Sequence, residues 1–527
     1  MSVWRPCVRR VLVMQKRQHS TGRDYTAAVA ALNGLQSNFA IVEAIRKAGP
    51  GWNKRAIPDM LSWLRRIGYE PTDLDTLNPI HIAGTKGKGS TSSFISSILA
   101  QYLPSTKSVY AERVPTSVGL YTSPHLRFVR ERIKINNQPI SEELFAECFW
   151  ELWDRLEATK ADAVDQDARS LDGKPVYFHY LTLMAFHCYV QQQVGTAVIE
   201  CGIGGEYDTT NLFIKPAVTG ITSLGIDHEA LLGDTIEDIA WHKAGIFKED
   251  VPAFTVEQPA NALRVLRERA KERKTELHVV PLHAAIDSIE LGLQGHFQKL
   301  NASLAVAVSA LHLARLGFSG LPNPYDPNAA LPAEFIKGLE DTRLGGRCDL
   351  RRDTAKSNVT WYIDGGHTLE SIDVAGRWFA SKSANTSEHA HRILIFNQQT
   401  RDASSLAQRL HDTLATAVKD SRPFKHAIFC PNTTYRNAGY KADLVSINTN
   451  KEDVSSLRVQ HELAKSWDKI DPHAQVHVVS TVEEAVHKAR ELATDRQTDI
   501  LATGSLHLVG GLIEVLEDEV ETSGAKL

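Results

Sequence analysis

The chain has few cysteines, no long apolar run and no excess of basic residues, and each absence excludes a class of protein. Its six cysteines, among 527 residues, are scattered and form no C-x-x-C pair, which excludes a disulfide framework and a cysteine-built zinc site. No uninterrupted apolar stretch approaches the roughly 18 residues that span a bilayer. The formal net charge of -4 argues against a nucleic-acid-binding surface, which would carry a basic excess.

The first 23 residues differ in composition from the rest of the chain. They contain six basic residues interleaved with apolar ones, and the first acidic residue is Asp24. An acid-free, arginine-rich leader over residues 1–23 is typical of a mitochondrial presequence, and the alternative is a disordered basic arm. Because Met14 could start a shorter form with a weaker leader, we expect both mitochondrial and cytoplasmic locations.

The remaining residues alternate between strand-like and helix-like patterns. A chain of this length exceeds one hydrophobic core and suits two or three domains. Proline and asparagine cluster at 321–328, which predicts a boundary between domains at 24–330 and 331–527. Strand–helix alternation on both sides of it predicts an α/β fold with mostly parallel sheets. The predicted strands are 118–121, 196–200, 217–222, 253–256, 277–280, 359–363, 392–396, 427–429, 476–479 and 500–502; the predicted helices include 141–158, 177–193, 235–247 and 259–273.

A glycine-rich turn follows the apolar run that starts at Ile80. It reads Gly84-Thr-Lys-Gly-Lys-Gly-Ser-Thr91, and a helical pattern leaves it. Glycines let consecutive backbone N–H groups surround an anion, and the helix N-terminus adds partial positive charge. Lys88 can reach phosphate oxygens, and Ser90 or Thr91 can offer a hydroxyl to Mg²⁺. The spacing departs from a strict Walker A, but strand, turn and helix together predict nucleotide phosphate binding rather than a merely structural turn.

Polar residues end two of the predicted strands, where open α/β sheets place their ligands. Glu200 ends one strand and precedes three glycines, and a carboxylate there is costly to bury without a cation. Asp227 and His228 follow another strand. Ser90, Glu200 and His228 together would supply a hydroxyl, a carboxylate and an imidazole to one divalent ion. The alternative is that Glu200 pairs with Lys88 or an arginine, and that His228 only forms hydrogen bonds.

Three further segments have mainly structural interpretations. Thr235 and Asp238 form a capping box that starts a helix, and a helix lysine such as Lys243 is normally a solvated surface charge. The acidic run from Glu514 to Glu521 is typical of a solvated helix face. His179 and His187 lie on an amphipathic helix, where core packing is favoured over ligand binding.

The second half repeats the arrangement of strand, acid, glycines and histidine at Asp364-Gly-Gly-His367. Arg347 lies just past the predicted domain boundary. An acid, a histidine and an arginine that come from a second domain could close on a triphosphate bound by the first. The sequence therefore predicts a site between two domains.

Taken together, these segments resemble the folylpolyglutamate synthases, in the folate branch of the Mur-ligase family, and specifically the eukaryotic type. The matching segments run in family order from about residue 25 to about residue 515. One departure is Gly366, where the family often has alanine. The segments that carry the resemblance are 84–90, 119–126, 130–135, 200–211, 227–228, 242–247, 296–302, 364–367 and 503–507.

The resemblance implies two domains, an N-terminal P-loop ATPase domain and a smaller Rossmann-like C-terminal domain, with ATP, Mg²⁺ and L-glutamate as ligands. A monovalent cation such as K⁺ is a further candidate, and we expect a monomer. Lys88, Lys243 and His228 would be catalytic, Lys243 matching a lysine that is carbamylated in relatives. Ser90, Glu200 and His228 would bind the metal. The implied ATP contacts are Gly84, Thr85, Lys86, Gly87, Lys88, Gly89, Ser90, Thr91, Asn301, Arg347, Asp364 and His367, and the folate-side loop is Thr122, Ser123, Pro124, His125 and Leu126.

The implied reaction adds L-glutamate to the γ-carboxylate of tetrahydrofolate and its polyglutamates. ATP would first phosphorylate that carboxylate, and the amine of the incoming glutamate would attack the acyl phosphate. The nearest alternative is a dihydrofolate synthase, or a bifunctional enzyme, that joins glutamate to dihydropteroate. An alternative from another class is a nucleotide-sensing protein without turnover, which would have no need of Ser90, Glu200, His228 and Lys243 together.

Overall fold

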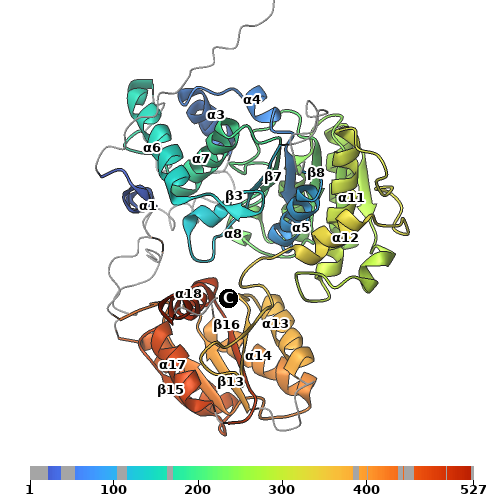
Figure 1. Ribbon diagram of the computed structural model, residues 1–527. Coiled ribbons are helices and arrows are strands. Elements are labelled where there is room, and N and C mark those ends of the chain that lie inside the picture. Colours follow the sequence, from blue (N-terminus) through green and yellow to red (C-terminus); the bar gives the residue numbers. More distant parts are fainter. Residues whose placement is uncertain are drawn as a thin grey trace, which may run out of the picture.

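The computed structural model has two bodies, each built on its own sheet (Figure 1). It describes residues 22–36, 54–103, 116–162, 170–383, 391–399, 402–436, 443, 456–493 and 495–523. Nearly all of the predicted presequence, residues 1–21, lies outside these ranges and stays a prediction. None of the helices in the described ranges is long and apolar enough to cross a membrane.

The first body contains an eight-stranded sheet in the order β10-β9-β8-β1-β7-β2-β3-β4, parallel except for β3 and β4. A separate two-stranded sheet pairs β5 (Ser170–Leu171) with β6 (Lys174–Pro175). The strands of the large sheet are β1 (Ile80–Ala83), β2 (Val118–Tyr121), β3 (Ile133–Ile135), β4 (Gln138–Pro139), β7 (Thr196–Glu200), β8 (Val218–Ile221), β9 (Ala253–Val256) and β10 (Leu277–Val280). The helices are α1 (Tyr25–Gly34), α3 (Ala56–Arg66), α4 (Pro71–Asp75), α5 (Lys88–Ala100), α6 (Glu142–Ala158), α7 (Tyr177–Gln191), α8 (Glu229–Leu232), α9 (Ile236–Lys243), α10 (Ala260–Glu272), α11 (Gln298–Arg315) and α12 (Ala333–Asp341).

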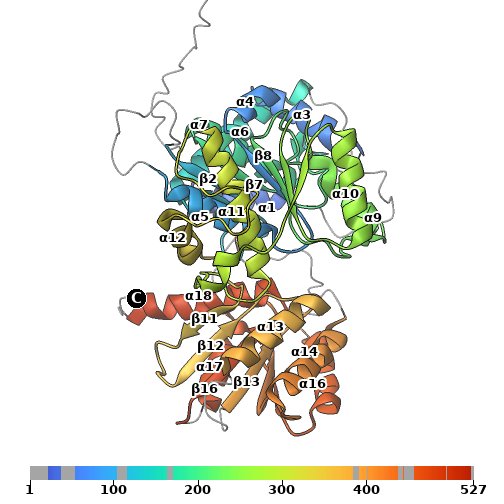
Figure 2. The same ribbon diagram turned by 90° about the vertical axis from the view of Figure 1, so that its right-hand side faces the viewer.

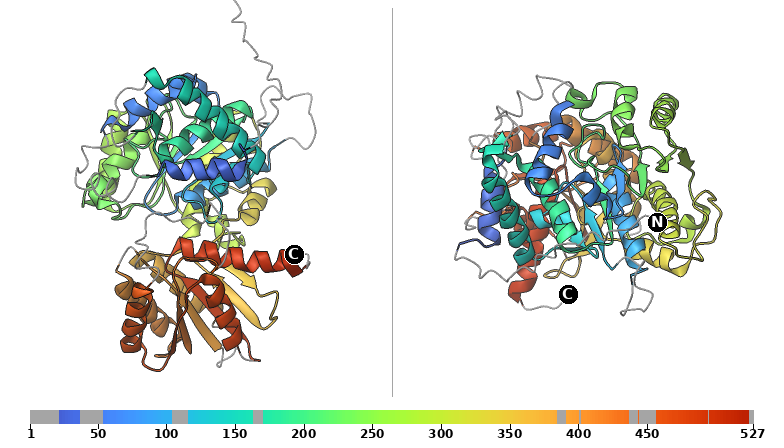
Figure 3. Two further views of the ribbon diagram at one scale, coloured as in Figure 1. Left: turned by 90° about the vertical axis from the view of Figure 1, so that its left-hand side faces the viewer. Right: turned by 90° about the horizontal axis from the view of Figure 1, so that it is seen from above.

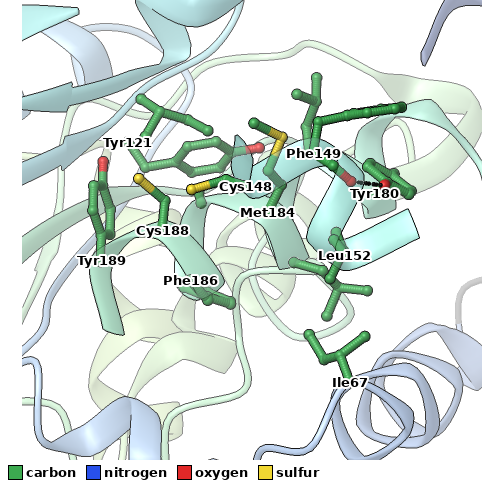
Figure 4. Close-up of a cluster of buried hydrophobic side chains, with 14 of the residues drawn as sticks. Ile67, Tyr121, Cys148, Phe149, Leu152, Tyr180, Met184, Phe186, Cys188 and Tyr189 are labelled. Atoms are coloured by element: carbon green, nitrogen blue, oxygen red, sulfur yellow. Dashed lines mark hydrogen bonds between the residues drawn. The ribbon is translucent and has the colours of Figure 1, made fainter. Parts of the chain in front are cut away.

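Helices cover both faces of this sheet, because alternate strand residues point to opposite sides. In β7, Val198 packs in the core cluster beneath α5 and α11, whereas Ile199 joins the cluster formed by α6 and α7. Figure 4 shows the second cluster, in which the Tyr180 hydroxyl donates to the Phe149 carbonyl at 2.8 Å. His187 is buried in the same layer, with Nδ1 2.9 Å from the Tyr69 hydroxyl, so the prediction of core packing for His187 is confirmed.

The second body contains a six-stranded sheet in the order β11-β12-β16-β13-β14-β15, parallel except for β11. The predicted strands of this half are all present, with ends that agree to within two residues. The strands are β11 (Asp349–Arg352), β12 (Val359–Ile363), β13 (His391–Phe396), β14 (His426–Phe429), β15 (Gln475–Val478) and β16 (Thr498–Thr503). The helices are α13 (Leu369–Ser383), α14 (Ala403–Val418), α16 (Arg458–Ile470), α17 (Val482–Leu492) and α18 (Leu506–Ser523).

Helix α12 packs with the first body, although it follows the predicted boundary at residue 330. A Cβ on Gly338 would lie 2.6 Å from the Ile98 Cα in α5, and Phe335 and Leu339 are fully buried in the same core cluster. Tyr325, in the proline-rich segment, stacks on Phe254 of β9. That segment is therefore a loop of the first body, and we propose that the second domain begins close to β11.

The C-terminal part of α18 differs from the solvated helix face that the sequence predicted. The helix runs along the side of the second body that faces the first (Figures 2 and 3). Glu514 is 2% exposed, and both it and Glu517 bind Arg127 of the first body. The prediction of a solvated face is therefore wrong for Glu514, which packing against the other body buries, whereas the side chain of Glu517 is 34% exposed.

Candidate active site

Four neighbouring parallel strands, β8, β1, β7 and β2, end at the same edge of the large sheet. The glycine-rich turn follows β1, and Glu200 is the last residue of β7. The predicted folate-side loop, Thr122 to Leu126, follows β2. This edge therefore brings together three of the segments that the sequence separates by up to about 120 residues.

At two positions of the turn the surrounding atoms leave room only for glycine. Gly84 has φ 148°, and a Cβ there would lie 1.8 Å from the Thr222 Oγ1; Gly87 has φ 87°, and a Cβ would lie 2.2 Å from the Asn301 Oδ1. The N–H groups of Thr85 and Lys86 donate to the Ser223 carbonyl at 3.0 and 3.1 Å. The turn is thus held by the segment after β8, and α5 begins directly behind it with N–H groups that have no partner within the helix.

Two lysines converge on the Gly84 carbonyl. Lys88 Nζ donates to it at 2.9 Å and Lys243 Nζ at 2.8 Å. Lys243 ends α9, whose first turn is capped by Thr235 as predicted: the Thr235 hydroxyl accepts the Asp238 N–H at 3.1 Å. Unlike an ordinary helix lysine, Lys243 is buried, and desolvation together with the charge of Lys88 lowers its pKa to about 7.

Glu200 is a buried carboxylate without a paired cation. It accepts the Ser123 N–H at 2.9 Å and lies against the first turn of α5, 3.5 Å from the place of a Cβ on Gly89. Burial raises its pKa to about 7, although Lys88, the Ser123 amide and Arg347 each lower it. Among the described residues no ion pair includes Glu200, so the alternative of a direct pair with Lys88 is not what the structure shows; Lys88 binds carbonyl oxygens instead.

The other two predicted metal ligands lie in different surroundings. Ser90 is buried in the first turn of α5, and its Oγ accepts from Gln298 Nε2 at 3.2 Å. His228 is exposed, has a left-handed backbone with φ 56°, and begins α8. Within the described part of the chain, no three His, Cys, Asp or Glu side chains form a ready-made metal site. The set of Ser90, Glu200 and His228 therefore stays a prediction.

Sequence reasoning did not find the polar network beside Ser90. Gln298 and Asn301 are one helical turn apart at the start of α11, and Asn301 Nδ2 donates to Gln298 Oε1 at 2.8 Å. Gln298 belongs to the segment 296–302 that carries the resemblance, but it lies neither at a strand end nor in a glycine-rich turn, so no sequence pattern singled it out.

Lys86, a predicted ATP contact, pairs with Asp227 at 3.1 Å, and that pair lies on the exposed side of the turn.

The predicted residues of the second body gather where β11 and β12 meet. Asp364 is buried and accepts the N–H groups of Cys348 at 2.9 Å and Gly366 at 2.8 Å, so it shapes this turn. His367 Nδ1 lies 3.0 Å from the Gly365 carbonyl. The positive charge of Arg347 lowers the pKa of Asp364 and also that of Glu200 in the first body, while burial raises both. Arg347 is thus within electrostatic reach of the phosphate-binding edge.

The loop after β2 lies between the bodies, with Thr122 buried, Pro124 exposed and the other three residues half-buried. The Thr122 N–H donates to the Arg132 carbonyl at 3.1 Å, and Arg132 Nε donates to His125 Nδ1 at 2.9 Å. The peptide bond between Ser123 and Pro124 is cis. Burial and the nearby charges of Arg132 and His507 hold the pKa of His125 well below its usual range. Arg132 and His507 are thus two polar residues near this loop, and no sequence motif had placed them there.

Comparison with known proteins identifies relatives along nearly the whole chain. No family model matches. The folylpolyglutamate synthases of Saccharomyces cerevisiae strains FostersO and AWRI796 are each 46% identical over 510 residues, which cover 96% of this chain and 89% of the relative. Among solved structures, Mycobacterium tuberculosis folylpolyglutamate synthase complexed with ADP shares the fold with a TM-score of 0.67 at 20% identity, covering 94% of this chain and 99% of that one. An FPGS–AMPPCP–folate complex gives 0.61 at 22% identity, over 94% and 99%. The predicted two-domain α/β fold is confirmed, and the chain belongs to the folylpolyglutamate synthase family.

Proposed function

We propose that this protein is an ATP-dependent ligase that adds L-glutamate to the γ-carboxylate of tetrahydrofolate and its polyglutamates. The observation that carries the proposal is the single sheet edge that places the phosphate-binding turn, Glu200 and the Thr122–Leu126 loop opposite Arg347 of the other body. The two solved structures named above support it, since one was solved with ADP and the other with AMPPCP and folate.

The residues of this chain would promote phosphoryl transfer chiefly by positioning the reactants and by neutralising the charge of the phosphates. The first N–H groups of α5 and the ammonium group of Lys88 would hold the β- and γ-phosphates of ATP. Arg347 would meet the charge that develops on the transferred phosphoryl group. A glutamate amine then attacks the acyl phosphate, and the amide forms as phosphate leaves. Closure of the bodies would keep water from the acyl phosphate.

The residues at the turn fit a divalent cation. Glu200 is a buried carboxylate that forms no ion pair with any of the described residues, and burial raises its pKa despite the nearby charges of Lys88, Arg347 and Arg132. Glu200 and the Ser90 hydroxyl would hold Mg²⁺, with His228 as a third candidate. When bound, the ion would neutralise charge on the phosphates and on the acyl-phosphate oxygens.

Lys243 fits the carbamylation that the family resemblance implies. Carbon dioxide reacts with a neutral amine, and a pKa of about 7 leaves much of the Lys243 side chain neutral near pH 7. The carbamate would be an anion beside Lys88. We expect protein incubated with ¹³C-labelled bicarbonate to show a carbamate carbon signal by NMR, and the Lys243→Arg variant to lack it. A signal of equal intensity in the variant would contradict the assignment.

The function is tested by two substrates assayed in parallel. We expect ATP-dependent incorporation of labelled glutamate with tetrahydrofolate as acceptor, and much less with dihydropteroate. ADP formation should depend on both acceptor and glutamate, because the acyl phosphate is consumed by the amine. Incorporation with dihydropteroate alone would make the enzyme a dihydrofolate synthase. Nucleotide binding without turnover on either acceptor would make it a sensor.

A further inference from the structure

The segment after the Thr122–Leu126 loop contacts the second body at helix α18. Arg127 Nε donates to Glu514 Oε2 at 2.7 Å, and the same guanidinium pairs with Glu517. Glu517 also accepts from Arg351 of β11 at 2.8 Å. Arg127 therefore joins the end of this loop to α18 and, through Glu517, to β11, which begins two residues after Arg347.

The loop is tied to its own body at both ends. At its start, the Ser123 N–H donates to the Glu200 carboxylate at 2.9 Å. At its end, the Glu131 carboxylate accepts the N–H groups of Leu126 at 2.8 Å, Arg127 at 3.2 Å and Phe128 at 3.1 Å. These hydrogen bonds fix the loop to its own body at Ser123 and at Leu126, so the position of Arg127 depends on both bodies.

The backbones of the two bodies approach closely at the same place. A Cβ on Gly510 of α18 would lie 2.1 Å from the Leu126 carbonyl oxygen, so only glycine allows this approach. The Leu126 side chain lies 3.0 Å from the places of Cβ atoms on Gly345 and Gly346, just before Arg347. The loop therefore sits directly between α18 and the segment that carries Arg347.

The ion pair at this contact is largely removed from water. The side chain of Arg127 is 14% exposed and that of Glu514 is 3% exposed. Loss of Arg127 would remove a largely buried contact between the bodies, which is more costly than loss of an exposed pair, whereas loss of Glu514 would still leave Arg127 beside Glu517. Nothing in the phosphate-binding chemistry requires this pair, because neither residue lies in the turn or beside Lys88.

We propose that Arg127 and Glu514 form a positioning pair that sets the Thr122–Leu126 loop against the second body and thereby determines the affinity for the folate acceptor. This inference rests on the proposed function for the identity of the acceptor. It predicts an effect on folate binding with little effect on ATP, since the glycine-rich turn and Lys88 are held by separate contacts.

The test compares the single variants Arg127→Ala and Glu514→Gln, their double variant, and Arg490→Ala as a control. Arg490 is a matched control because its side chain is 11% exposed and pairs with the buried Asp353, which also belongs to the second body. We expect both single variants to raise the KM for tetrahydrofolate by about tenfold or more while the KM for ATP is unchanged. The double variant should be no worse than the singles, because the residues act as a pair.

Hydrogen–deuterium exchange of peptides covering residues 122–132 supplies a readout that does not need turnover. Exchange should be faster in the Arg127 and Glu514 variants than in wild type, and unchanged in Arg490→Ala, which should only lower the melting temperature. The inference is overturned if Arg127→Ala matches Arg490→Ala in both folate KM and exchange, or if the two single effects add in the double variant. If Arg127→Ala does not fold, Arg127→Lys replaces it, with a smaller change in the same direction. If wild type does not use tetrahydrofolate, the proposed function fails, and exchange alone decides whether α18 holds the loop.

Discussion

Replacing Glu200 by glutamine is expected to abolish ligation and, at the same time, to make the ligand-free protein more stable at neutral and alkaline pH. Burial raises the pKa of Glu200 from 4.5 to about 7. The folded protein therefore binds more protons at this position than the unfolded chain, and stability falls as pH rises from about 4.5 to about 7. Glutamine keeps the acceptor for the Ser123 N–H and removes this cost, which is up to about 3 kcal/mol.

This prediction is tested by measuring kcat, and the melting temperature at pH 5 and pH 8, for the wild type and for Glu200→Gln. Glu206→Gln is the matched control, because Glu206 pairs with Arg269 and Arg273 in the same body and its loss should lower the melting temperature. The wild-type protein, but not Glu200→Gln, should gain stability when Mg²⁺ and an ATP analogue are added. A variant that retains more than about a tenth of the wild-type kcat, a loss below about 1.4 kcal/mol, would remove Glu200 from the metal-binding role.

Arg347→Ala is expected to impair the use of ATP strongly while the melting temperature barely moves. Arg347 belongs to the second body, and its positive charge acts against the rise in the pKa of Glu200 that burial causes in the first body. If it meets charge developing on the phosphoryl group, its removal costs about 2–4 kcal/mol of transition-state stabilisation. Arg347→Lys should recover only part of this, since an ammonium cannot reproduce a planar, bidentate contact.

The rate at limiting ATP, with saturating acceptor, is the measurement for Arg347. Arg343→Ala is the control: Arg343 is exposed and donates only to the neighbouring carbonyls of Glu340 and Thr342. Both variants should fold as wild type does. Wild-type kinetics for Arg347→Ala would mean that the second body does not contribute this residue to the nucleotide site.

The features that sequence predicted well depend on neighbours close along the chain. Strands such as 196–200 and 253–256 have the predicted ends, because a short, mainly apolar run that is buried along its whole length has few other solutions. Thr235 caps α9 through a hydrogen bond three residues away. Gly84 and Gly87 were marked by composition alone, and both have the positive φ that favours glycine.

Tertiary structure alone decided which charges are buried and which residues face each other across the two bodies. Lys243 and Glu514 lie on helices whose local pattern is that of a solvent-exposed face, yet a second element covers each of them. Burial depends on packing between segments far apart in sequence, here Gly84 with Lys243 and Arg127 with Glu514. For the same reason α12 packs with the first body, although the prolines before it predicted a domain boundary there. The sequence by itself therefore determined the fold class, the glycine-rich turn and the family, whereas the environment that sets the pKa of Glu200 and Lys243 arose only from the folded chain.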